Sequence, residues 1–272
     1  MLEEVHGLHG ATIHALDGEI GRVDDILFDD KQWTVRYLLV ETGGWLTGQK
    51  VLISPMAFGS LDWAKHTLNL NLTCEQIKNS PSAETDKPVS RQWERDYYDY
   101  YAWPYYWGGM GSWGTFWYPG ELFTQSRGDL LTSHSEDDYE AKYHADTNLR
   151  STKEVTGYKI AAIDGHLGHV KDFLVNDDTW RISYLGIDTR DWWPGKKVLL
   201  APQWIEDISW GESKVFVNLS RDKIRQSPEY TETSLLTRDL ETRLHRHYDR
   251  KGYWMDEPVR KSVADAKVAN AK

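Results

Sequence analysis

Two histidines three positions apart are the first residues in this sequence whose type and spacing suggest chemistry. His166 and His169 have a spacing that metal ligands often use, but a zinc site needs three or four converging groups. On a strand or turn, this spacing should point the two rings in different directions. The residues 147 positions earlier are Glu19 and Arg22, so the pair does not recur. We expect no metal site here.

The other candidate nucleophiles and acid–base groups also have structural explanations. Cys74 lies just inside a predicted helix start, where the helix dipole could lower the pKa of its thiol, but no histidine is assigned beside it. His245 and His247 are two positions apart on a predicted helix, and so lie on different faces, which is typical of a solvated helix. No P-loop and no dinucleotide-binding glycine motif is present.

The densest carboxylates are the pairs Asp24-Asp25 and Asp29-Asp30. A calcium loop would need ligands at alternating positions and a central glycine, which this stretch lacks. Only the second member of each pair recurs 147 residues later, as Asp172 and Asp177, and we expect these residues to cap turns. We therefore predict no catalytic residue, no cofactor, no metal and no enzymatic activity.

Most of these residues belong to a long internal repeat. Residues 10–81 align without a gap to residues 157–228, with about 26 identical pairs in 72 positions. A self-match of this length indicates two copies of one structural unit. It also predicts that the two copies superpose, with Trp33 over Trp180 and Tyr37 over Tyr184.

The pattern within each copy resembles a known family. Asp-Gly-x-x-Gly-x-Val-x-Asp begins at Asp17 and at Asp164, and Trp and Tyr on the next strand precede Lys-Val-Leu-x-x-Pro. This resembles the PRC-barrel, the module shared by the H subunit of photosynthetic reaction centres and the C-terminal part of the ribosome maturation factor. The match covers about residues 5–81 and 152–228. The resemblance implies a small antiparallel barrel that serves protein–protein contact and has no catalytic site of its own.

The pattern of apolar residues predicts a mainly β protein with two tandem small antiparallel β-barrels of about six strands, each followed by short helices. An apolar phase change after Tyr37, repeated after Tyr184, predicts a bulge. Thr73 and Ser220 are predicted helix N-caps. We divide the chain into barrel 1 (1–81), a helix packing on it (82–102), an aromatic and acidic linker (103–150), barrel 2 (151–228), a C-terminal helix (229–254) and a flexible tail (255–272).

The most unusual stretch of the chain runs from the predicted helix into the linker, because residues 93–123 contain about 14 aromatic side chains with interspersed glycines. Two interpretations stay open. The rings either cover the barrels and bury the joint between them, or form an exposed partner site, since Trp and Tyr dominate binding hot spots. We expect Trp103 to be packed and Trp113 and Trp117 to be exposed. The predicted partner-binding residues are Trp107, Trp113, Phe116, Trp117 and Tyr118.

Composition excludes several classes of protein. The chain has a net charge of −10, and no basic run suited to nucleic acid. Counted by halves, residues 1–150 carry 12 basic and 23 acidic side chains and residues 151–272 carry 20 and 19, so the charge of −11 lies in the first half. One cysteine excludes an intrachain disulfide. No segment predicts a signal peptide or membrane span, so we expect a cytoplasmic protein.

Together these features predict a non-enzymatic protein–protein docking or assembly module whose partner is a protein, with a homo-oligomer as a further option. The first alternative is a peripheral accessory of a membrane electron-transport or photosynthetic-type complex. The second alternative is an enzyme or ligand-binding protein with a cleft between the barrels.

Overall fold

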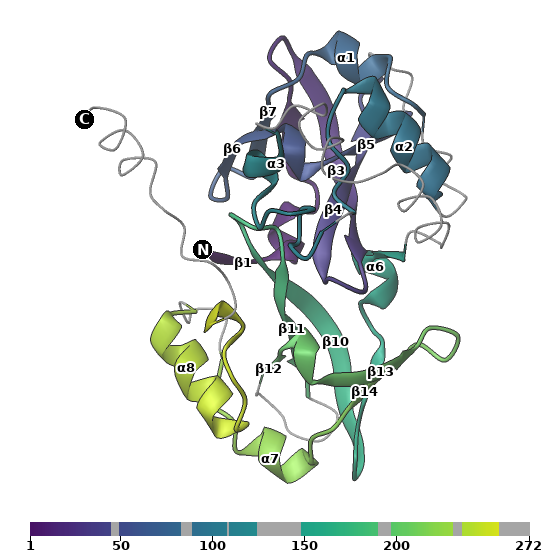
Figure 1. Ribbon diagram of the computed structural model, residues 1–272. Coiled ribbons are helices and arrows are strands. Elements are labelled where there is room, and N and C mark those ends of the chain that lie inside the picture. The colour runs from purple at the N-terminus through teal and green to yellow at the C-terminus, as the bar shows by residue number, and fades with distance from the viewer. Residues whose placement is uncertain are drawn as a thin grey trace, which may run out of the picture. The chain divides into compact units, whose positions relative to one another are not determined.

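The computed structural model describes residues 1–44, 49–82, 89–107, 109–123, 148–189, 197–230 and 236–255. These residues fall in two compact units, Met1–Ser234 and Leu235–Lys272. The first unit contains two seven-stranded sheets (Figure 1), and the second contains the helix α8 (Arg238–His247) and the short helix η5 (Tyr253–Met255). Most of the predicted linker and tail lies outside the described residues.

The two sheets have the same strand order. In the first it is β5-β4-β3-β2-β7-β6 and in the second β12-β11-β10-β9-β14-β13. The equal order is what the 147-residue repeat predicts, and both predicted tyrosines, Tyr37 and Tyr184, are fully buried. The strands of the first sheet are β2 (Thr12–His14), β3 (Glu19–Asp29), β4 (Thr34–Thr42), β5 (Lys50–Ile53), β6 (Phe58–Asp62) and β7 (Thr67–Leu70). Those of the second are β9 (Lys159–Ala162), β10 (Gly165–Asn176), β11 (Ile182–Asp188), β12 (Lys197–Leu200), β13 (Ile205–Ser209) and β14 (Lys214–Val217).

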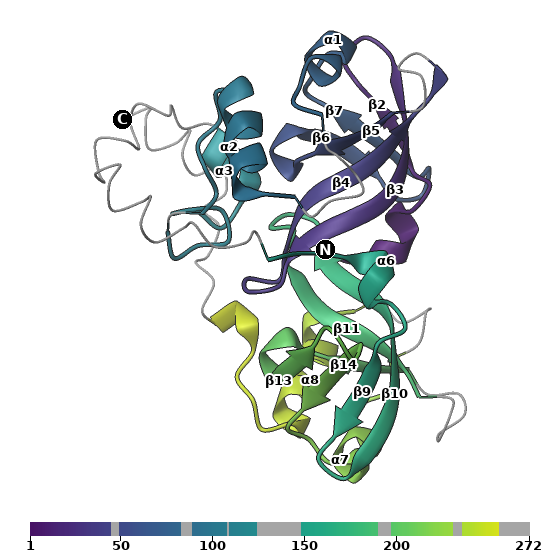
Figure 2. The same ribbon diagram turned by 90° about the vertical axis from the view of Figure 1, so that its right-hand side faces the viewer.

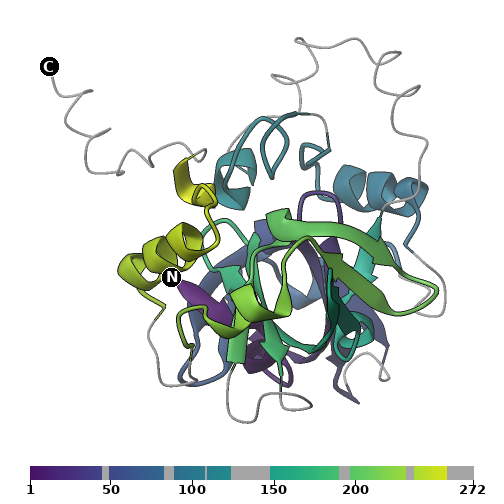
Figure 3. The ribbon, with the colours of Figure 1, turned by 90° about the horizontal axis from the view of Figure 1, so that it is seen from below.

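The sheets differ from the predicted antiparallel barrels in two respects. β2 pairs with β7, and β9 with β14, in parallel, and in each copy the intervening strands form the long crossover that parallel pairing requires. The described pairings also leave the outer strands of each path, such as β12 and β13, without a hydrogen-bonded ladder between them. Each sheet is therefore strongly curved (Figure 3) but not closed by its hydrogen bonds.

The predicted bulges are confirmed. Leu27 pairs with Tyr37 and Phe28 pairs with Val35, so Arg36 is the extra residue on β4. Ser183 has the same place on β11. A second bulge, on the neighbouring strand, has Asp24 as its extra residue on β3 and Lys171 on β10. A bulge bends a strand and redirects side chains. Asp24 and Lys171 both line a pocket between the two copies.

Two glycines of the repeated motif are required by close strand approach. Gly21 has a φ of 153° and Gly168 a φ of 151°. A Cβ atom at either position would lie 2.0 Å from a carbonyl oxygen of the adjacent strand, that of Glu41 or Asp188. Only glycine fits such an approach.

The two copies exchange their N-terminal arms (Figure 2). Arm 1, which consists of β1 (Leu2–Glu4) and η1 (Val5–Leu8), adds its strand to β10 of the second sheet. Arm 2, which consists of β8 (Leu149–Ser151) and α6 (Thr152–Val155), adds its strand to β3 of the first sheet. The registers are equivalent, since Leu2 faces Asn176 and Leu149 faces Asp29. Sequence analysis did not predict this exchange.

The exchange follows an approximate two-fold axis within the first unit. Thr34 forms a β-bridge with Arg181, its own counterpart 147 residues later. The amide of Val35 donates to the Trp180 carbonyl at 2.8 Å, and the amide of Ile182 donates to the Trp33 carbonyl at 2.7 Å. The two copies thus meet through equivalent residues, as subunits of a symmetric dimer do.

Helices complete the units. The predicted caps are confirmed, because Thr73 caps α1 (Cys74–Lys78) and Ser220 caps α7 (Arg221–Arg225). α2 (Arg91–Tyr100) packs on the first sheet, where the hydroxyl of its Tyr97 accepts from the Ser54 amide at 3.2 Å. The remaining short helices are η3 (Pro55–Ala57), α3 (Pro119–Phe123) and η4 (Pro202–Trp204). Over the described part of the chain, no helix combines the length and apolar character needed to span a bilayer.

Candidate functional site

The aromatic segment after α2 has a buried inner layer. Trp103, Tyr106 and Trp107 are at most 6% exposed, and Trp113 is fully buried. The Trp113 indole nitrogen donates to the Thr179 carbonyl of the second copy at 2.8 Å. Trp103 is packed as predicted, whereas the expected exposure of Trp113 is wrong. The flanking glycines form a tight turn that directs its ring inward over the joint, with Gly111 and Gly114 bridged to each other.

The outer layer of this segment is partly exposed. Phe116, Trp117 and Tyr118 are half-buried, and Phe123 at the end of α3 is 44% exposed. These four rings are here called the aromatic edge. They combine accessible apolar surface with the polar N–H of Trp117 and the hydroxyl of Tyr118. Of the five predicted partner-binding residues, the structure thus leaves three accessible and buries Trp107 and Trp113.

A buried carboxylate anchors the inner layer. The side chain of Glu94 on α2 is fully buried, and its Oε1 accepts from the hydroxyls of Tyr37 at 2.9 Å and Tyr106 at 2.8 Å. Arg91 donates to its other oxygen at 2.5 Å. Burial raises the pKa of Glu94 to about 7, while Arg91 and the two tyrosines oppose the rise. Its hydrogen bonds join α2 to Tyr37 on β4 and to Tyr106 of the aromatic segment.

Arg36, the bulge residue of β4, supports the same layer. Its guanidinium carbon lies 3.9 Å from the centre of the Tyr106 ring and 5.0 Å from that of Trp113. It donates to the Ser112 carbonyl at 2.5 Å and pairs with Asp29 at 3.3 Å. Asp29 also accepts from the amides of Lys31 and Gln32 in the following turn, so this turn is capped by the first aspartate of the pair, which was not among the residues predicted to cap turns.

The second unit repeats part of this cluster. Arg238 pairs with the buried Glu241 at 2.9 Å, and the Tyr253 hydroxyl donates to Glu241 at 2.7 Å. The Arg238 guanidinium lies 4.3 Å from the centre of the Trp254 ring, as that of Arg91 lies 4.3 Å from Trp107. All four residues follow their counterparts by 147 positions. An alignment of the two copies continued past residues 81 and 228 would have found this cluster in the sequence.

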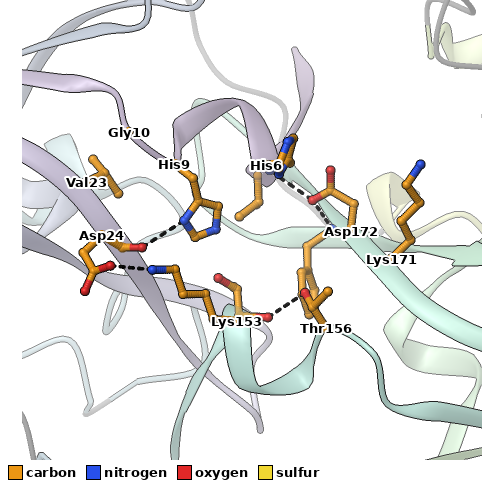
Figure 4. Close-up of a pocket in the computed structure, with 12 residues that line it drawn as sticks. His6, His9, Gly10, Val23, Asp24, Lys153, Thr156, Lys171 and Asp172 are labelled. Carbon is orange, nitrogen blue, oxygen red and sulfur yellow. Dashed lines mark hydrogen bonds and ion pairs between the residues drawn. The ribbon is translucent and has the colours of Figure 1, made fainter.

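A pocket lies between the two exchanged arms, on the approximate two-fold axis (Figure 4). It has a volume of about 400 Å³. Equivalent positions of the two copies line it, among them His6 with Lys153, His9 with Thr156, and the bulge residues Asp24 with Lys171. Sequence analysis named a cleft between the barrels only as an alternative, and it did not predict these lining residues, because they come together through the arm exchange.

The charges around the pocket are unequally compensated. Both Lys50, at 2.7 Å, and Lys153 bind the carboxylate of Asp24, and these hydrogen bonds lower its pKa. Among the described residues, the donors to Asp172 are the amides of Phe173 at 2.7 Å and His6 at 3.0 Å. Burial raises the pKa of Asp172 to about 6, and the neighbouring Glu4 adds to the rise.

Asp25 and Asp172 were predicted to cap turns, and this prediction is wrong. Asp25 lies within β3 and accepts from the hydroxyls of Ser151 and Thr152 and from the amide of Lys153. Asp172 accepts from the equivalent amide of arm 1. Each carboxylate therefore holds the N-terminal end of the short helix in the other copy's arm, an interaction that needs the tertiary exchange.

Other sequence-predicted residues also differ from expectation. The rings of His166 and His169 lie 5.2 Å apart, because the bulge at Leu167 turns both to one side. His245 is buried rather than solvated, with its Nδ1 2.7 Å from the Lys251 carbonyl oxygen. The pKa of the Cys74 thiol is raised by burial and by Asp17 instead of lowered. Among the residues with described positions, no three His, Cys, Asp or Glu side chains are grouped to hold a metal.

Comparison with known proteins identifies the first copy. An uncharacterized protein of Deinococcus radiodurans is 31% identical over 84 residues, which cover 30% of this chain and 30% of that protein. The chain therefore spans less than a third of this curated relative's length. The model of the PRC-barrel domain matches residues 8–63, a range that includes the repeated glycine motif and β2 to β6. Residues 8–63 are thus a PRC-barrel domain.

Proposed function

We propose that this chain is a non-enzymatic docking module in which the aromatic edge contacts a protein partner. The observation that carries the proposal is the division of one aromatic segment into a buried layer and an accessible one. A rigid inner layer holds the outer rings in place, so binding would cost little ordering entropy. Partly exposed Trp and Tyr rings at such a place are typical of binding hot spots.

The PRC-barrel domain supports this proposal at a general level, because that module serves protein interaction and assembly. We further propose that the second sheet is a second PRC-barrel, since it has the same strand order, the same bulges and the same glycine positions. The photosynthetic-type alternative and the cytoplasmic location stay predictions.

A photo-crosslinking experiment tests the proposal. A benzoylphenylalanine is placed at Trp117, and the full-length protein is irradiated in native extract. We expect one predominant crosslinked protein, identified by mass spectrometry and competed by unlabelled wild-type protein. The control is the same photoreactive residue at the exposed Asp207 on β13, which should give no competed product.

Matched alanine variants then separate binding from folding. Trp117→Ala should keep the melting temperature and weaken binding of the identified protein at least tenfold. Trp113→Ala should lower the melting temperature, because a buried ring is removed. If Trp117→Ala binds as tightly as the wild type, the aromatic edge is not the contact surface.

A further inference from the structure

The pocket between the exchanged arms offers hydrogen-bond acceptors that the protein itself leaves unused. The Nδ1 of His9 lies 3.0 Å from the Asp24 carbonyl oxygen. A carbonyl can only accept, so this nitrogen must carry the proton and the neutral ring has an acceptor at Nε2. That nitrogen points into the pocket (Figure 4), and no described residue donates to it.

The second acceptor is the carboxylate of Asp172 on the other side of the pocket. Both of its hydrogen bonds reach Oδ1, and in the described part of the chain nothing donates to Oδ2 and no cationic side chain forms an ion pair with it. Its negative charge lies next to that of Glu4, which is in turn close to that of Glu3. A partly buried carboxylate among like charges favours a cation.

The two lysines of the lining do not fill this role. Lys153 binds Asp24, and Lys171 has interactions of its own. A bare metal ion is a poorer match, because the described histidines and carboxylates form no group of three around one point, while the pocket volume of about 400 Å³ suits a larger group.

We propose that this pocket binds a primary ammonium or guanidinium group, which donates hydrogen bonds to Asp172 and to the Nε2 of His9. Its N–H groups would satisfy both acceptors, and its charge would balance the carboxylate. The alkyl stem of such a group would lie against Val5, Val23 and Phe173, the apolar residues of the lining. This inference goes beyond the proposed function, since the pocket is separate from the aromatic edge and one can fail without the other.

The test is a titration of the full-length protein with butylammonium, followed by the ¹⁵N and ¹H shifts of the His9 ring at about pH 8, where an ordinary imidazole is neutral. We expect saturable shifts. Tetramethylammonium at the same ionic strength has no N–H group and should bind at least tenfold more weakly. Equal responses to the two cations would show ionic screening and overturn the proposal.

Two variants locate the response. Asp172→Asn keeps an acceptor for the two amides but removes the charge, and it should weaken butylammonium binding at least tenfold. Asp207→Asn, an exposed carboxylate outside the pocket lining, should leave binding unchanged. Should Asp172→Asn fold poorly, His9→Ala read by thermal shift serves instead, and unchanged binding in either variant contradicts the proposal.

Further probes distinguish the source of the group. Cadaverine stands for a free polyamine, and N-acetyl-lysinamide and N-acetyl-argininamide stand for a side chain of a partner protein. Tighter binding of cadaverine would assign a free amine, and tighter binding of either amide would assign a lysine or arginine of a partner. Absence of saturable binding by all three would refute the assignment.

Discussion

The junction of arm 2 with the first sheet and the junction of arm 1 with the second have the same backbone geometry but different side chains. At the first, Asp25 receives three hydrogen bonds from arm 2, and Asp30 pairs with Arg150 at 2.8 Å. At the second, Asp172 receives one amide from arm 1 and has Glu4 nearby. Strand pairing and register are thus common to the two exchanged arms, and we expect the side chains to decide how firmly each arm is held.

The largest expected effect on the free energy of unfolding is at Asp25, the carboxylate that accepts more hydrogen bonds from the other copy's arm. Asp25→Ala should lower the free energy of unfolding by about 2–4 kcal/mol, because buried donors of arm 2 lose their acceptor. Urea unfolding followed by circular dichroism measures the loss. Asp172→Ala is the matched control and should cost clearly less. Equal losses would show that the junctions do not differ in strength.

A smaller effect, an increase in the free energy of unfolding, is expected when Asp172 is replaced by asparagine. The folded-state pKa of Asp172 is raised from 3.8 to about 6, so the folded protein binds this proton more tightly than the unfolded chain does. Protonation of Asp172 therefore contributes to the free energy of unfolding. This contribution is fully present below pH 3.8 and is lost as the pH rises through about 6. Asp172→Asn should therefore be more stable than the wild type above pH 6, by about 1–2 kcal/mol after allowing for solvent screening.

Unfolding free energies of both proteins measured between about pH 4 and pH 8 check this prediction. The difference should be near zero at the acidic end and largest at the alkaline end. A difference that does not change with pH would mean that Asp172 titrates normally.

The smallest effect is expected at the ion pair on the pocket rim. The Lys153 side chain is about half exposed, and Asp24 also has Lys50 as a partner. Lys153→Met should thus lower the free energy of unfolding by less than about 1 kcal/mol. The loss should shrink further in 1 M salt, because screening weakens exposed pairs. A salt-independent loss would instead indicate a packing role for the lysine stem.

Local sequence was sufficient for much of the fold. The repeat predicted two copies with one strand order, the apolar phase shift predicted the bulges at Arg36 and Ser183, and the caps at Thr73 and Ser220 followed from residue type. Each of these depends on neighbours along the chain or on comparison of one copy with the other. The motif of Gly21 also carried the resemblance that the domain match confirms for residues 8–63.

Only the tertiary structure decided which segments lie together. The exchange of arms, the burial of Trp113 over the joint, and the lining of one pocket by His9 and Asp172 each join residues more than 60 positions apart. No local propensity distinguishes an arm that pairs with its own sheet from one that pairs with the other, because both offer the same backbone hydrogen bonds. The choice is made by packing at the two-fold axis, where Thr34 meets Arg181, and that packing exists only once both copies have folded.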